Sequence, residues 1–121
     1  MIQKRVQIIL MVVMLAFLLT ACKNTGKPDN VSDSAYNAGL RAIQIADDYL
    51  DYKITREEAV RQIGEISDRH PYDMESYKGD TDVFLAVATI DTSLWVTSKK
   101  TEADILEARN KLAAEINQPR R

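Results

Sequence analysis

Side chains that could perform acid–base or nucleophilic chemistry are scarce in this 121-residue sequence, which has one histidine, His70, and one cysteine, Cys22. A histidine acting as a general base needs a partner group within hydrogen-bond reach, and no nucleophile motif accompanies His70, which precedes a proline in a polar stretch. The sequence also lacks the Gly-rich phosphate-binding motifs, the His-Glu-x-x-His zinc motif and the Gly-x-Ser-x-Gly nucleophile motif. We therefore predict no catalytic residues, no cofactor and no enzymatic activity.

The segment from Asp47 to Glu58 has part of the ligand spacing of a helix–loop–helix calcium site. Four oxygen-bearing residues fall at ligand positions 1, 5, 9 and 12 of such a loop: Asp47, Asp51, Thr55 and Glu58. However, Tyr49 stands at position 3, where the pattern has an oxygen ligand, and Tyr52 stands at position 6, where a glycine permits the sharp turn. An acidic helix end, a short turn and a capped second helix explain the same residues, and on that interpretation we predict no metal site.

Binding is the chemistry that the polar stretch from Ser67 to Asp80 favours. Tyr72, Met74 and Tyr77 lie there, and loops often carry binding residues. Tyrosine is enriched at protein interfaces because its surface is large, stiff and amphipathic. We take these three residues as candidate partner-binding residues; the alternative is that they fold back over the end of the domain. Nucleic acid is not an expected partner, because the chain carries a net charge of −2 and has no basic patch.

The N-terminal residues have the pattern of an export signal. Lys4 and Arg5 precede an unbroken apolar run, residues 8–19, and the small residue Ala21 precedes Cys22. A basic start, an apolar stretch of about 7–15 residues and a small residue at the cleavage site define such a signal. The run is shorter than the ~20 apolar residues that a membrane-spanning helix needs.

The junction Leu19-Thr20-Ala21-Cys22 resembles the lipobox of bacterial lipoproteins, although Thr20 is less usual at its position. The resemblance implies that residues 1–21 are a signal peptide removed by signal peptidase II. It also implies that Cys22 becomes a lipidated N-terminus, and that residues 22–31 tether the domain to the membrane. A chain with two acyl groups anchors stably, whereas one acyl group gives only marginal binding. The alternatives are a plain secretory signal with an incidental cysteine, or an uncleaved anchor.

The lipoprotein resemblance implies a location outside the cytoplasm, on the outer face of the plasma membrane, or on the outer membrane if the cell is diderm. The rest of the chain is similar in layout to small uncharacterised helical lipoproteins of monoderm bacteria, which implies no activity. Beyond residue 21 the chain holds 14 Lys and Arg against 18 Asp and Glu, a net charge of −4.

Three segments show the 3.6-residue periodicity of amphipathic helices. The first, residues 33–52, follows a capping Ser32 or Asp33; its apolar stripe is Tyr36, Leu40, Ile43, Asp47 and Leu50, widened by Ala35, Ala38, Ala42, Ile45, Ala46 and Tyr49. The second starts at a Thr55–Glu58 capping box, with the stripe Ala59, Ile63 and Ile66. The last starts at a similar Thr101–Asp104 pair, with the stripe Ile105, Ala108, Leu112 and Ile116, and ends at Gln118.

Residues 82–98 are ambiguous, because they are rich in residues that favour strands while Val83, Val87, Ile90 and Leu94 fit a helical stripe. We predict a helix there, with Trp95 in the core; the alternative is a hairpin that turns at residues 91–93. A further short helix opening at Pro71 is compatible with the preference of proline for a first helical position. The expected fold is all-α: a small antiparallel bundle of three to four helices, arranged as two helical hairpins over residues 32–118.

Two functions fit these expectations. The first is a lipid-anchored extracytoplasmic interaction module that binds a protein or another envelope component. The alternative is a small envelope enzyme or ligand carrier that uses carboxylates and tyrosines. A filled core with an exposed apolar patch would favour the first, and a concave pocket lined by convergent polar groups would favour the second.

Overall fold

The computed structural model describes residues 26–121, in which every regular element is helical. The helices are α2 (Asp33–Leu50), α3 (Arg56–Asp68), α4 (Gly79–Trp95) and α5 (Thr101–Glu115). The expected all-α bundle is thus confirmed. The expected signal peptide, residues 1–21, and Cys22 lie outside the described residues.

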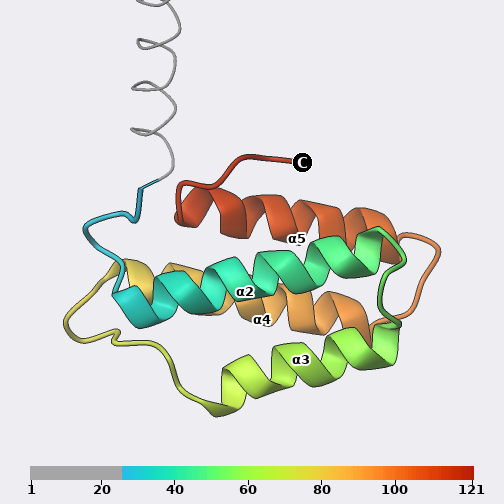
Figure 1. Cartoon of the computed structure of the whole chain (residues 1–121), viewed down its shortest axis with the longest axis horizontal. Helices are drawn as coiled ribbons and strands as arrows, with labels where there is room; N and C mark the ends of the chain where they lie inside the picture. The colour runs from blue at the N-terminus through green and yellow to red at the C-terminus, as the bar shows by residue number, and fades with distance from the viewer. Residues whose placement is uncertain (1–25) are drawn as a thin grey trace, which may run out of the picture.

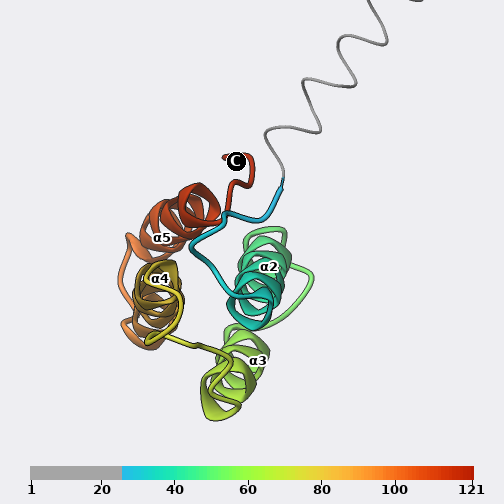
Figure 2. The same cartoon turned by 90° about the vertical axis from the view of Figure 1, so that its left-hand side faces the viewer.

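The helices form two antiparallel hairpins, α2 with α3 and α4 with α5 (Figure 1). Viewed end-on, α2 and α4 face each other across the middle of the bundle, with α3 and α5 on either side (Figure 2). Both α2 and α4 contact all of the other described helices, whereas α3 and α5 touch only α2 and α4. Each middle helix must therefore bury a broad face.

The core consists of aliphatic side chains from all four helices. The predicted stripes of α3 and α5 are confirmed, since Ala59, Ile63 and Ile66 and also Ile105, Ala108, Leu112 and Ile116 are buried. On α2 the buried face is centred differently: Tyr36, Leu40 and Leu50 are only partly buried. The face that enters the core is instead Ala35, Ala38, Ala42, Ile45 and Ala46, together with Ile43. The small alanine side chains on this face allow α2 to pack against α3, α4 and α5.

Residues 79–95 are a helix, so the hairpin alternative for residues 82–98 is wrong. Val83, Val87, Ile90 and Leu94 point into the core and are essentially fully buried, because packing against three helices overrides the strand preference of the sequence. The placement of Trp95 in the core is also wrong, since Trp95 is 65 % exposed. It is the last residue of α4 and is rotated by about 100° from Leu94, which occupies the buried position.

The predicted N-cap bonds of the first two helices are confirmed, although the Glu58 carboxylate accepts from Arg61 and Gln62 and does not complete the capping box. The Ser32 hydroxyl accepts from Ala35 N–H and the Thr55 hydroxyl accepts from Glu58 N–H, 3.1 Å in both cases. The capping box at Thr101 is wrong, because Thr101 is already the first residue of α5 and its hydroxyl donates to the Ser98 carbonyl at 2.8 Å.

Two further boundaries differ from expectation. No helix opens at Pro71, which lies in the loop between α3 and α4. α2 ends at Leu50 rather than at residue 52, because Tyr52 adopts a left-handed conformation (φ 60°). Lys53 N–H then donates to the Asp48 carbonyl at 2.8 Å, the bond that closes a Schellman motif.

The described end of the expected tether, residues 26–31, packs against the bundle. Val31 is buried in the core, and the Asn30 carbonyl accepts from Gly79 N–H at 2.9 Å. Asn117 Nδ2 donates to the Gly26 carbonyl at 3.2 Å, so the described chain begins beside the end of α5. None of the helices within residues 26–121 is both long and apolar enough to cross a membrane.

Candidate functional site

The solvent-facing side of α4 is unusually poor in charge. Between Asp82 and Lys99 the only charged residue is Asp91, which is half-buried. Beyond the first turn, the exposed residues of α4 are all uncharged: Phe84, Leu85, Thr89, Thr92 and Trp95. Solvated helix faces ordinarily carry charged and polar side chains, so this face has the composition of a surface that becomes covered.

The two flanking helices, α3 and α5, provide the contrast. On α3 the exposed residues are all charged: Glu57, Arg61, Glu65 and Asp68. On α5 they are mostly charged: Glu102, Ala103, Asp104, Glu107, Lys111, Ala114 and Glu115. The absence of charge is therefore a property of α4 and not of the whole domain.

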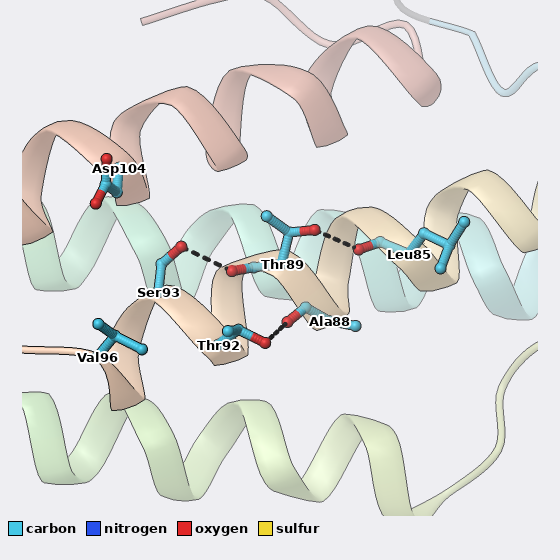
Figure 3. Close-up of a pocket in the computed structure, with 7 residues that line it drawn as sticks. All are labelled: Leu85, Ala88, Thr89, Thr92, Ser93, Val96 and Asp104. Carbon is cyan, nitrogen blue, oxygen red and sulfur yellow. Dashed lines mark hydrogen bonds between the residues drawn. The ribbon is translucent and has the colours of Figure 1, made fainter.

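A shallow groove of about 440 Å³ runs along this face between α4 and α5 (Figure 3). We call it the α4 groove; its lining is Leu85, Ala88, Thr89, Thr92, Ser93 and Val96 from α4 and Asp104 from α5. Leu85 is 54 % and Val96 60 % exposed. Ala88, Thr89 and Thr92 lie between them along α4, so the lining from this helix carries methyl groups and no charge.

The hydroxyl groups in the α4 groove are bonded within their own helix (Figure 3). Thr89 donates to the Leu85 carbonyl at 2.8 Å, Thr92 to the Ala88 carbonyl at 3.0 Å, and Ser93 to the Thr89 carbonyl at 2.8 Å. Because each hydroxyl proton is already used, an apolar partner can cover these side chains without leaving an unpaired donor. The groove is thus less polar than its residue types suggest.

The predicted binding residues Tyr72 and Met74 lie together on a second groove, of about 500 Å³, at the other end of α4. Its lining is Ser67, His70, Tyr72, Asp73, Met74, Glu75 and Phe84. The rings of Tyr72 and Phe84 pack edge to face, with centroids 5.3 Å apart and an interplanar angle of 76°. Met74 is 42 % exposed. His70 is exposed and shares the lining of this groove with the two aromatic rings.

Tyr77 does not line this groove. It is half-buried beneath Lys27, whose ammonium nitrogen is 5.8 Å from the centre of the ring. The structure therefore brings two of the three predicted binding residues together and places the third against the N-terminal segment. Tyr77 contributes to holding residues 26–31 on the bundle rather than to the exposed surface.

Tyr72 is the anchor of its loop. Its hydroxyl is buried and has no hydrogen-bond partner among residues 26–121. Burial raises the pKa of the Tyr72 phenol to about 12, and the negative charge of Asp80 adds to this increase. The ring is thus held by packing rather than by a polar contact.

Asp80 fixes the loop relative to α2. Its fully buried carboxylate accepts from Ser32 N–H at 2.8 Å, from the Ser32 hydroxyl at 2.6 Å and from Asp73 N–H at 2.7 Å. Because Ser32 gives its only hydroxyl proton to Asp80, its lone pairs remain free to accept from Ala35 N–H. One carboxylate thereby joins the start of α2, the start of α4 and the intervening loop, and positions the second groove.

The residues with calcium-loop spacing bond to other groups of the fold, and Arg121 contacts both Asp47 and Asp51. Asp47 forms a two-point ion pair with Arg109, at 2.9 and 3.2 Å, Asp51 bonds to Arg121, and Thr55 caps α3. Hydrogen bonds from Arg61 and Gln62 lower the pKa of the Glu58 carboxyl to about 2. Within residues 26–121 there is no cluster of three or more His, Cys, Asp or Glu side chains that could hold a metal ion.

The α4 groove is not among the binding surfaces that the sequence predicts. Its signal in the sequence is the run of residues 83–98, in which Asp91 is the only charged residue, and the strand-favouring residue types of that run obscure it. A helix that is apolar on more than one side must be covered on more than one side.

Comparisons of the chain with family models, with curated proteins and with solved structures find no match.

Proposed function

We propose that this protein is a lipid-anchored extracytoplasmic interaction module of a bacterial envelope, and that the α4 groove is its docking surface. The observation that carries the docking role is the uncharged, partly apolar solvent-facing side of α4 on a domain whose flanking helices, α3 and α5, are heavily charged. Covering one exposed large aliphatic side chain contributes roughly 1.5–3 kcal/mol. Leu85 and Val96, both more than half exposed, are the principal sources.

The lipid anchor rests on the N-terminal sequence. Cys22 is the only cysteine, and it stands at the position that a lipobox requires, directly after a short apolar segment. Residues 26–31 pack beside the start of α2, the end of α5 and the first residue of α4, Gly79, whereas the groove lies further along α4, at residues 85–96. An anchor at Cys22 would therefore leave the α4 groove accessible to an envelope partner.

The alternative, a small enzyme or ligand carrier, has less support. Both grooves are open to solvent, and the hydroxyls of the α4 groove are bonded to their own backbone rather than directed at a common point. Ligand sites are usually enclosed, with a few convergent polar groups. The second groove is the better candidate for this alternative, since His70, Ser67 and Glu75 share its lining.

The test is photo-crosslinking in living cells with a photoreactive amino acid at Thr92, in the centre of the α4 groove. The matched control carries the same probe at Glu65, an exposed residue of α3 on a charged face. The proposal expects a discrete crosslinked product from Thr92 and none from Glu65. Equal labelling at both positions, or no product from Thr92 in cells that make the protein, would refute the docking role.

A further inference from the structure

We infer that the partner of the α4 groove is a positively charged amphipathic helix, an inference that rests on the proposed docking role. The groove runs between two antiparallel helices, which is the shape that accepts a third helix along its apolar face. From Leu85 to Val96 it spans about 16 Å at 1.5 Å per residue, which corresponds to roughly three turns of a bound helix.

The charge of the partner follows from the border of the groove. Asp104 lines it directly. Helical spacing places Glu107, Lys111 and Glu115 on the same side of α5 as Asp104, and places Asp82 two turns before Thr89 on α4. All of these residues are exposed, and Lys111 is the only cation among them.

The acidic residues of this border are available to a partner. Within residues 26–121, the carboxylates of Asp82, Asp104, Glu107 and Glu115 form no internal hydrogen bond or ion pair. This differs from Asp47 on α2 and Asp51 directly after it, which are paired with Arg109 and Arg121. Lysine and arginine side chains can lay their apolar stems along a groove wall while their charges reach such a rim.

The same border disfavours two other occupants. An anionic lipid surface would meet the unpaired carboxylates of Asp104 and Glu107 beside the groove, with Lys99 and Lys100 only at its Val96 end, and the part of the chain beyond residue 21 carries a net charge of −4. A second copy of the chain, docked through the same groove, would place one acidic border against another, and like charges in apposition cost several kcal/mol. A cationic helix satisfies both the apolar floor and the acidic border.

The test uses the full-length protein reconstituted in phosphatidylcholine vesicles and a synthetic 18-residue helix of Leu and Lys, without aromatic residues. Trp95, the only tryptophan, adjoins Val96 in the groove, so its emission reports binding at this site. We expect a saturable blue shift with the Leu/Lys peptide and none with a Leu/Glu peptide of the same pattern. Binding of both peptides, or of neither, would overturn the inference.

Charge-reversed variants locate the contact. Asp104→Lys combined with Glu107→Lys should weaken binding of the Leu/Lys peptide about tenfold, because two exposed ion pairs with the peptide are lost and each contributes only modestly to the affinity. The matched control is Glu57→Lys combined with Glu65→Lys on α3, which should leave the affinity unchanged. Circular dichroism establishes that each variant is folded. Equal weakening in the control would assign the attraction to net charge and refute a site at the groove.

The remaining outcomes separate this inference from the proposed function. A Thr92 crosslink to an acidic or uncharged partner would contradict the cationic helix while leaving the docking role intact. A Thr92 crosslink between two copies of the chain would identify a self-associating face, and a blue shift of Trp95 caused by anionic vesicles alone would identify a lipid surface; either would overturn the inference. Absence of both peptide binding and Thr92 crosslinks would remove the docking role as well.

Discussion

Two glycines show how differently one residue type can act in a helix. A Cβ at Gly79 would lie 2.8 Å from the backbone oxygen of Asn30, whereas a Cβ at Gly64 on α3 meets nothing within 4 Å. Gly79 also donates its N–H to that same Asn30 carbonyl. Gly79 is therefore the point at which the N-terminal segment packs closely against the start of α4, whereas Gly64 lies inside the continuous helix α3 with open space beside it.

Substitution by alanine should consequently have opposite effects at these positions. Gly64→Ala should raise the free energy of unfolding by roughly 0.5–1 kcal/mol, because alanine is the better helix former. Gly79→Ala should lower it despite the same intrinsic gain, since residues 30–31 must move. Urea denaturation of both variants measures the difference. Stabilisation by Gly79→Ala would mean that residues 26–31 do not pack as described.

Tyr72 offers a prediction that depends on pH. Its pKa is raised from 10.0 to about 12, so the folded state holds the phenol proton more tightly than the unfolded chain. The resulting contribution to stability is complete below pH 10 and is lost as the pH rises from about 10 to about 12. Tyr72→Phe should remove this loss and, because the hydroxyl is buried without a partner, should be neutral or stabilising at pH 7.

The measurement for Tyr72 is the melting temperature of the protein and of Tyr72→Phe between pH 7 and pH 12. Tyr36→Phe serves as the control, because Gln118 donates to the Tyr36 hydroxyl at 3.2 Å and the variant loses that bond. A marked destabilisation by Tyr72→Phe at pH 7 would indicate that its hydroxyl has a partner.

Single residues also explain which helix ends could be predicted. Ser32 and Thr55 have the side chains that bond free N–H groups, and both caps were predictable from residue type alone. The C-terminal ends of α2 and α3 were not, because Tyr52 and His70 adopt left-handed conformations that a sequence normally signals with glycine or asparagine. Asp80 was equally hidden, since a buried carboxylate is recognisable only once its donors are placed around it.

At the scale of elements, α2 and α5 are joined by a charged clamp. Arg109, whose side chain is 8 % exposed, holds both carboxylate oxygens of Asp47 and donates to the Pro119 carbonyl at 2.7 Å. Asp47→Ala should therefore destabilise the domain by up to about 3–5 kcal/mol, the range for removing one member of a buried pair.

The control for this clamp is Asp48→Ala, one residue along α2, where the carboxylate bonds only to exposed Gln44. It should change stability by about 0.5 kcal/mol or less. Chemical denaturation of both variants gives the comparison. If both variants lower the free energy of unfolding by the same small amount, the hydrogen bond from Arg109 to the Pro119 carbonyl is sufficient without Asp47.

The helices were predictable to different degrees for physical reasons. Ile63 in α3 and Leu112 in α5 belong to narrow stripes with charged neighbours, so one periodicity located both the helix and its buried side. α4 gave mixed signals because apolar residues occupy its outer face as well as its core face, which obscured its amphipathic pattern. The ambiguity of residues 82–98 and the wrong placement of Trp95 thus have the same origin as the candidate site.

At the scale of the whole molecule, the proposed function depends on a lipid anchor at Cys22. If Cys22 carries the lipid, mass spectrometry of the N-terminal peptide of the mature protein should find a diacylglyceryl-modified cysteine at its first position. Cys22→Ser should abolish that modification and leave the precursor unprocessed. An unmodified Cys22, or a mature chain beginning elsewhere, would remove the anchor and leave a secreted or signal-anchored protein with the same fold.

The central claim, that the outer face of α4 exists to be covered by a partner, is tested most directly by Leu85→Gln combined with the Thr92 photoprobe in cells. Leu85 is 54 % exposed, so glutamine should change the melting temperature of the purified protein little, as expected for a surface substitution. It should nevertheless remove most of the Thr92 crosslink, because the partner loses its principal apolar contact. An undiminished crosslink in Leu85→Gln, with the fold intact, would contradict the claim.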